Sequence, residues 1–140
     1  MNPFALVDTG PLVALLDQRD QHHRWVSEQM PLLRPPLRTC EAVLAEAFHL
    51  LRNLPKARMA ILEMILEGVL TLPFLLREQA QEVLALLQRY ANVPMSLADA
   101  CLVRMSELVP DCLVFTLDSD FRIYRRHKRE KIPLLIPPQR

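Results

Sequence analysis

Short apolar runs alternate along this chain with longer segments in which apolar residues recur every three or four positions. Runs of the first kind, bounded by polar or turn residues, are typical of strands in a sheet that is covered on both faces. They lie at residues 4–7, 69–73, 113–117 and 134–136. The longer segments predict helices at residues 11–16, 22–30, 39–54, 56–67, 75–90 and 96–109. Strands that alternate with helices in this way predict an α/β fold around a mostly parallel sheet.

Prolines and a possible cap set the limits of these elements. Pro31, Pro35 and Pro36 predict an extended connection, because proline disfavours helix at and just before itself. Thr39 is a suitable N-cap for the helix that follows, and Pro55 is expected to stop that helix.

Composition limits the kind of protein this can be. The chain has 140 residues, 51% of them hydrophobic and 24% charged, which fits one globular domain over residues 1–140. Only two glycines occur, so a glycine-rich nucleotide-binding loop cannot be written with them. Three cysteines without CxxC spacing predict neither a disulfide framework nor a zinc site. No signal peptide or membrane span is apparent, and we expect a cytoplasmic protein.

Positive charge is concentrated near the C-terminus. The net charge is only +1, but residues 122–131 read Arg-Ile-Tyr-Arg-Arg-His-Lys-Arg-Glu-Lys. Such a segment is either a solvated surface or a contact for a phosphate backbone. In the second interpretation Arg122, Arg125 and Arg126 are candidate RNA-binding residues.

Two acids directly follow apolar runs. Asp8 comes after the first predicted strand and Asp118 after residues 113–117. Ligands collect at the carboxyl ends of parallel strands, so both acids are placed for chemistry. Asp99 lies at the start of the helix that leads into the Asp118 strand. Each also has a local explanation: Asp8 as an N-cap, Asp118 in an Asx-turn, and Asp99 in a capping box with Ser96.

Glu46 has no such local explanation, because it lies in the middle of a predicted helix. On a helical wheel it borders an apolar stripe, and a carboxylate that leans toward buried surface needs a partner. The stripe consists of Val43, Ala47, Leu50, Leu51 and Leu54. Glu41 is a competing candidate in the first turn, where the helix dipole favours an acid, and the wheel does not decide between the two.

Acids gathered at one edge of a sheet repel one another unless a cation lies between them. Carboxylate oxygens without histidines at ligand spacing suit Mg²⁺ or Mn²⁺ rather than zinc. The residues therefore predict a divalent-metal site.

Four segments together resemble the PIN-domain family of metal-dependent nucleases, which includes the VapC-type toxins. They lie at residues 7–15, 43–47, 96–100 and 116–121, in the family's order, and the resemblance spans nearly the whole chain. It implies a three-layer α/β/α sandwich in which Asp8, Glu46, Asp99 and Asp118 hold metal, and it favours Glu46 over Glu41.

The resemblance also implies accessory roles, a reaction and partners. Thr9 and Thr116 match small hydroxyl residues near the metal, and Asp120 is a further accessory residue. The implied function is a metal-dependent endoribonuclease, the toxin of a type II toxin–antitoxin pair. RNA, an antitoxin protein and a second copy of the chain are the implied partners.

Two alternatives remain open. A nonhydrolytic module of the same fold would bind RNA or an antitoxin without turnover. A receiver-like signalling domain would also place acids at strand ends. It requires adjacent acids after the first strand, however, and the neighbours of Asp8 are Val7 and Thr9.

Overall fold

The computed structural model describes residues 2–139, and its centre is a sheet of five parallel strands. The spatial order is β3-β2-β1-β4-β7. The strands are β1 (Phe4–Val7), β2 (Leu37–Arg38), β3 (Leu70–Thr71), β4 (Cys112–Phe115) and β7 (Leu134–Leu135). β1 and β4 pair in parallel with Leu6 opposite Val114. Their carboxyl ends therefore meet at one edge of the sheet, as the sequence predicts.

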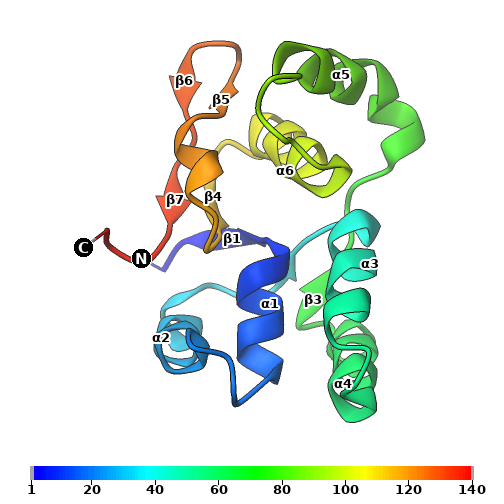
Figure 1. Ribbon diagram of the computed structural model, residues 1–140, viewed down its shortest axis with the longest axis vertical. Coiled ribbons are helices and arrows are strands. Elements are labelled where there is room, and N and C mark those ends of the chain that lie inside the picture. The colour runs from blue at the N-terminus through cyan, green and yellow to red at the C-terminus, as the bar shows by residue number, and fades with distance from the viewer. Residues whose placement is uncertain (1, 140) are drawn as a thin grey trace.

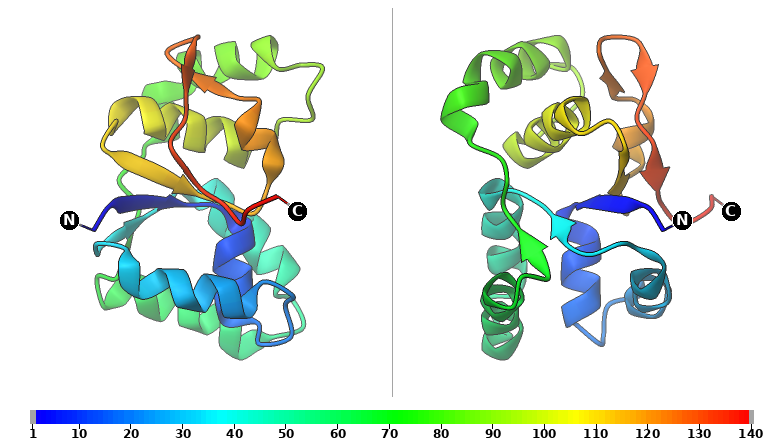
Figure 2. Two further views of the ribbon diagram at one scale, coloured as in Figure 1. Left: turned by 90° about the vertical axis from the view of Figure 1, so that its left-hand side faces the viewer. Right: turned by 180° about the vertical axis from the view of Figure 1, so that it is seen from behind.

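Helices cover both faces of this sheet, which confirms the predicted α/β/α sandwich. The helices are α1 (Thr9–Leu16), α2 (His23–Gln29), α3 (Glu41–Leu50), α4 (Pro55–Leu66), α5 (Leu76–Arg89) and α6 (Leu97–Leu108). Figure 1 shows α5 and α6 above the sheet and α1, α2 and α4 below it, and both views in Figure 2 keep this division. Within residues 2–139, no helix combines the length and apolar character that crossing a bilayer requires.

The core explains why the central strands are apolar without alternation. Leu6 on β1 and Val114 and Phe115 on β4 are completely buried between the helical layers. The Trp25 ring of α2 packs edge-on against Phe115, with 5.8 Å between ring centroids. A strand that is buried on both faces has no solvent side on which a polar residue would be favoured.

The predicted helix at residues 39–54 has the wrong ends. α3 runs only from Glu41 to Leu50, with Cys40 at the N-cap position. Thr39 is not the cap, because its hydroxyl donates to the carbonyl of Val7 at 2.7 Å. At the other end the chain leaves the helix before Pro55, which is then the first residue of α4, where its missing N–H is harmless.

The connection around the prolines also differs from the prediction. Pro31 lies in the first turn of a 3₁₀ helix, η1 (Met30–Leu32), a position that tolerates proline. β2 follows Pro36 and was not predicted. It has only two residues, yet it pairs with both β1 and β3 and so extends the sheet.

The basic segment has a structure that the sequence did not predict. After the 3₁₀ turn η2 (Ser119–Arg122), it folds into an antiparallel hairpin of β5 (Arg125–Arg126) and β6 (Glu130–Lys131). The turn places His127 and Lys128 at φ values of 50° and 69°. Figure 1 shows the hairpin beside α5 and α6 rather than within the main sheet.

Candidate active site

Four carboxylates from four different elements line one open cavity of about 600 Å³. They are Asp8, between β1 and α1; Glu46, in the middle of α3; Asp99, in the first turn of α6; and Asp118, after β4. The remaining lining residues are Thr9, Gly10, Leu50, Pro94, Ser96, Leu117 and Ser119. The structure thus brings together the four acids that the sequence singled out.

Asp8 is the most enclosed of the four. Its Oδ1 accepts the Thr9 backbone N–H at 2.8 Å, and its Oδ2 accepts the Thr116 hydroxyl at 2.7 Å. Burial raises the pKa of Asp8 to about 6. The charges of Asp99 and Asp118 also raise this pKa, whereas the two hydrogen bonds lower it. An ionised Asp8 is therefore held at an energetic disadvantage that a nearby cation would relieve.

Glu46 is joined to Asp8 through one residue. The Thr9 hydroxyl donates to Glu46 Oε1 at 2.8 Å, while the Thr9 amide binds Asp8. Glu41 is exposed and does not line the cavity. The predicted apolar stripe is correct at Val43, Ala47 and Leu51, which are buried. It is wrong at Leu50 and Leu54, which are exposed, and Leu50 lies at the edge of the cavity beside Glu46.

Asp99 is fixed from two directions. Its backbone N–H donates to the Ser96 Oγ at 3.0 Å, so Ser96 caps α6 as predicted. Its Oδ2 accepts the hydroxyl of Tyr124 at 2.9 Å. Burial raises the pKa of Asp99, the nearby charge of Asp118 adds to this, and the Tyr124 hydroxyl opposes it.

Asp118 is the exposed member of the set. Its Oδ1 accepts the Asp120 backbone N–H at 2.9 Å, and its own amide donates to the Thr116 hydroxyl at 3.0 Å. Thr116 therefore connects Asp8 with the Asp118 turn, as Thr9 connects Asp8 with Glu46. Asp120 contributes its amide to this turn, but it does not line the cavity.

Three of the acids keep the local roles that the sequence predicts, and they also line the shared cavity. Asp8 caps α1, Asp99 takes part in the first turn of α6, and Asp118 makes an Asx-turn. These interactions hold each carboxylate at the start of its element. Because the elements begin at one edge of the sheet, the same interactions bring the acids to one place.

The basic residues of the C-terminal segment are not equivalent. Arg126 is buried, and its guanidinium donates to the carbonyls of Ser106 and Pro110 and to Glu130. It is a structural residue, and the expectation that it contacts RNA is not supported. Arg122 and Arg125 are half-buried and line a separate cavity of about 270 Å³.

The donor set fits a hard divalent cation. Among residues 2–139, no three carboxylate, imidazole or thiol groups already stand within ligating range of one point. Asp8 and Asp99 are buried and held by hydrogen bonds, whereas Asp118 is exposed and Glu46 is half-buried. Four oxygen ligands with no nitrogen or sulfur among them are the kind that Mg²⁺ and Mn²⁺ prefer.

Tyr124 is the site residue that the sequence did not reveal. It is completely buried, packs edge-on against Tyr90 and Phe121, and orients Asp99 through its hydroxyl. In the sequence it lies among arginines, in the segment that predicts either a solvated surface or a phosphate contact. Only the folding of the basic segment against α6 places it at the carboxylates.

Comparisons with known proteins agree with this fold. A family model described as the PIN domain matches residues 5–126. The fold is similar to the crystal structure of Mycobacterium tuberculosis VapC20, a sarcin-ricin loop cleaving toxin, with a TM-score of 0.75 and 20% sequence identity. That match covers 83% of this chain and 91% of the VapC20 chain. No curated protein matches the chain in sequence.

Proposed function

The chain belongs to the PIN domain family, and from this premise we propose that it is a metal-dependent endoribonuclease. The reaction is hydrolysis of phosphodiester bonds in single-stranded or looped RNA. The observation that carries the proposal is the meeting of Asp8, Glu46, Asp99 and Asp118 in one open cavity. We do not propose a receiver-like signalling domain, because the chain belongs to the PIN domain family.

The chain's own residues supply position and charge. Thr9 orients Glu46 and Asp8, Thr116 orients Asp8 and the Asp118 turn, and Tyr124 orients Asp99. The four carboxylates would hold Mg²⁺ or Mn²⁺. Such an ion lowers the pKa of a bound water and stabilises the charge that develops on a leaving oxygen. The open side of the cavity leaves access for a substrate strand.

A toxin role is the biological setting that we propose. VapC20, whose structure has a similar fold, is a toxin that cleaves the sarcin-ricin loop. It is a precedent for a looped substrate. The proposed partners are RNA and an inhibitory antitoxin protein. Arg122, the last residue of η2, and Arg125 are proposed to attract the phosphate backbone that the acidic cavity itself repels.

We also propose self-association through the outer face of α4. Met59, Leu62 and Leu66 recur at helical spacing and are exposed, Leu66 to 86%. Light scattering on the purified protein tests this, with Leu62→Glu and Leu66→Glu expected to give a monomer.

The nuclease proposal is tested by cleavage of fluorescent single-stranded RNA in Mn²⁺ or Mg²⁺. Cleavage is expected with either ion, and it should stop in EDTA and in the Asp8→Asn and Asp99→Asn variants. Glu41→Gln is the matched control on α3, because Glu41 lies outside the cavity, and it should cleave normally.

Two outcomes would contradict the proposal. Cleavage that survives EDTA and both asparagine variants would remove the carboxylate mechanism. RNA binding without cleavage in any divalent ion would instead favour the nonhydrolytic module.

A further inference from the structure

The catalytic cavity raises an electrostatic problem for a nuclease. It is lined by four acids and by no arginine or lysine. RNA is a polyanion, and phosphate contacts from basic groups dominate its affinity for proteins. Affinity for the strand must therefore come from cations outside this cavity.

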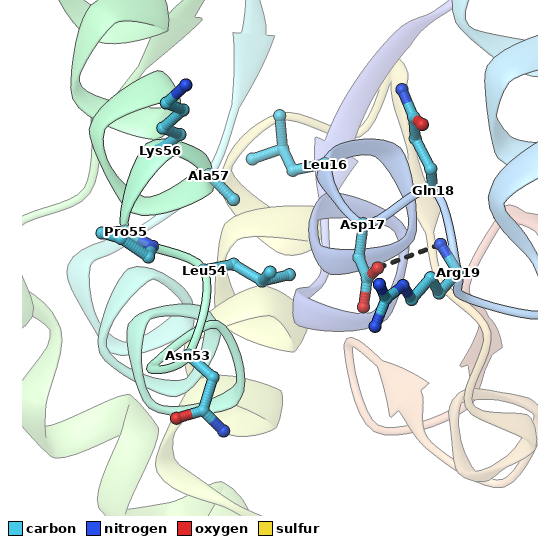
Figure 3. Close-up of a pocket in the computed structure, with 9 residues that line it drawn as sticks. All are labelled: Leu16, Asp17, Gln18, Arg19, Asn53, Leu54, Pro55, Lys56 and Ala57. Carbon is cyan, nitrogen blue, oxygen red and sulfur yellow. Dashed lines mark hydrogen bonds between the residues drawn. The ribbon is translucent and has the colours of Figure 1, made fainter.

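A second cavity lies at the far end of α1, and we call it the distal pocket (Figure 3). Its volume is about 690 Å³, within the usual range for small-molecule sites. The lining residues come from the end of α1 and the segment after it, and from the connection between α3 and α4 together with the first turn of α4. They are Leu16, Asp17, Gln18, Arg19, Asn53, Leu54, Pro55, Lys56 and Ala57.

The distal pocket and the carboxylates lie at opposite ends of α1. α1 and α3 follow the parallel strands β1 and β2, so both helices run away from the same sheet edge and pack side by side (Figure 1). From Thr9 to Leu16, α1 rises about 11 Å, which is the span of about three stacked nucleotides.

The lining of the distal pocket has the parts that a nucleotide requires. Figure 3 shows Leu16, Leu54 and Ala57 extending into the space between the two segments, where they form an apolar surface for a base. The side-chain amides of Gln18 and Asn53 lie on opposite sides of this apolar surface and carry both donors and acceptors.

Positive charge is in excess in the distal pocket. Arg19 and Lys56 are exposed, and neither forms an ion pair with an acid among the described residues. The one acid there is Asp17, whose Oδ1 accepts the Arg19 backbone N–H at 3.0 Å. Two cations against one carboxylate favour an anionic occupant.

We propose that the distal pocket binds a nucleotide of the RNA substrate, about three positions from the scissile phosphate. The base packs on the apolar surface, and Arg19 and Lys56 bind the adjoining phosphates. The inference rests on the proposed ribonuclease function and adds a second point of substrate recognition to it. An acidic peptide would bind the same cations, but its side chains would leave the apolar surface of Leu16, Leu54 and Ala57 uncovered, whereas a base would cover it, so the nucleotide fits better.

The test compares two double variants that remove the same charge. Arg19→Gln/Lys56→Gln alters the distal pocket, and Arg24→Gln/Arg77→Gln alters exposed arginines of α2 and α5 outside it. Binding of a fluorescent single-stranded RNA of about ten nucleotides is measured by anisotropy in EDTA, over a range of salt concentrations.

The distal-pocket variant is expected to lose about tenfold in affinity, and its log–log salt slope should fall by about 1.4, the value for two lost phosphate contacts on a single strand. The control should stay within about twofold. In Mn²⁺ the distal-pocket variant should have a higher KM for the longer RNA. Its KM for a dinucleotide, which is too short to reach the pocket, should be unchanged. The side-chain amide NMR signals of Gln18 and Asn53 should shift when RNA is added.

Unchanged affinity in the distal-pocket variant, or an equal loss in the control, would overturn the proposal. So would a variant that keeps its RNA affinity but loses affinity for a glutamate-rich peptide. Because binding is measured in EDTA, the result is separate from cleavage. Loss of binding in a protein that never cleaves RNA would support the pocket and contradict only the nuclease function.

Discussion

Replacing Asp8 by asparagine should stabilise the metal-free protein at neutral and higher pH. Asp8 is 6% exposed, and burial raises its pKa from 3.8 to about 6. The folded state thus holds the proton more tightly than the unfolded state. The free energy of unfolding therefore falls as the pH rises from about 4 to about 6, and this contribution is constant above that window.

The size of the effect follows from the same values. A rise in pKa from 3.8 to about 6 corresponds to about 3 kcal/mol of lost stability once Asp8 is ionised. Asparagine cannot ionise and keeps an oxygen for the Thr9 amide. It presents an amide to Thr116, however, and we expect this to cost about 1 kcal/mol. The variant should be less stable than the parent by about 1 kcal/mol near pH 4 and more stable by about 2 kcal/mol near pH 8.

Urea unfolding in EDTA, followed by the fluorescence of the single tryptophan, measures this difference. Trp25 is a suitable probe because it packs against Phe115 in the core. Asp111→Asn, an exposed acid, is the control and should show a difference that does not vary with pH. Added Mn²⁺ should raise the stability of the parent and not that of Asp8→Asn. A difference for Asp8→Asn that is independent of pH, or that has the opposite sign at pH 8, would refute the reasoning.

Three further changes test two residues of the site and one residue that supports the fold. Tyr124→Phe removes the hydroxyl that orients Asp99, and it should weaken Mn²⁺ binding by about tenfold in calorimetry. Circular dichroism should show that the fold is retained. Unchanged Mn²⁺ affinity would contradict the positioning role of Tyr124. Glu46→Gln should weaken Mn²⁺ binding while Glu41→Gln should not, and equal effects would contradict the choice of Glu46. Arg126→Met should lower the free energy of unfolding by about 2–4 kcal/mol in urea, because two carbonyls and one carboxylate lose their donor; a neutral result would contradict its structural role.

The sequence predicted the parts of the fold that have a local signal. β1 has the limits that its apolar run indicates, and α6 begins after Ser96. The two-residue strand β2 could not be found, because a segment so short has no periodicity and its strand conformation depends on pairing with β1 and β3. Thr39 has the chemistry of a cap, but its hydroxyl is taken by a carbonyl of β1, a contact that exists only in the folded sheet.

The residues of the candidate site likewise include some that the sequence predicted and some that it did not. Asp8, Asp99 and Asp118 were predictable because each stands next to the end of a strand or in the first turn of a helix, whereas Glu46 was preferred to Glu41 only through the resemblance. Tyr124 and Arg126 lie in a run that reads as surface, yet both are buried once the hairpin folds against α6. Burial of this kind depends on tertiary contacts, and the sequence of one basic segment does not reveal which of its residues turn inward.

Whether the four carboxylates hold a divalent ion is the question on which the proposed chemistry depends. It is tested most directly by anomalous scattering from crystals of the protein grown with Mn²⁺. We predict a manganese peak in the cavity, within coordination distance of oxygens from Asp8, Asp99 and Asp118 or Glu46. A well-ordered structure at saturating Mn²⁺ with no peak among these carboxylates would contradict the metal site and the nuclease mechanism built on it.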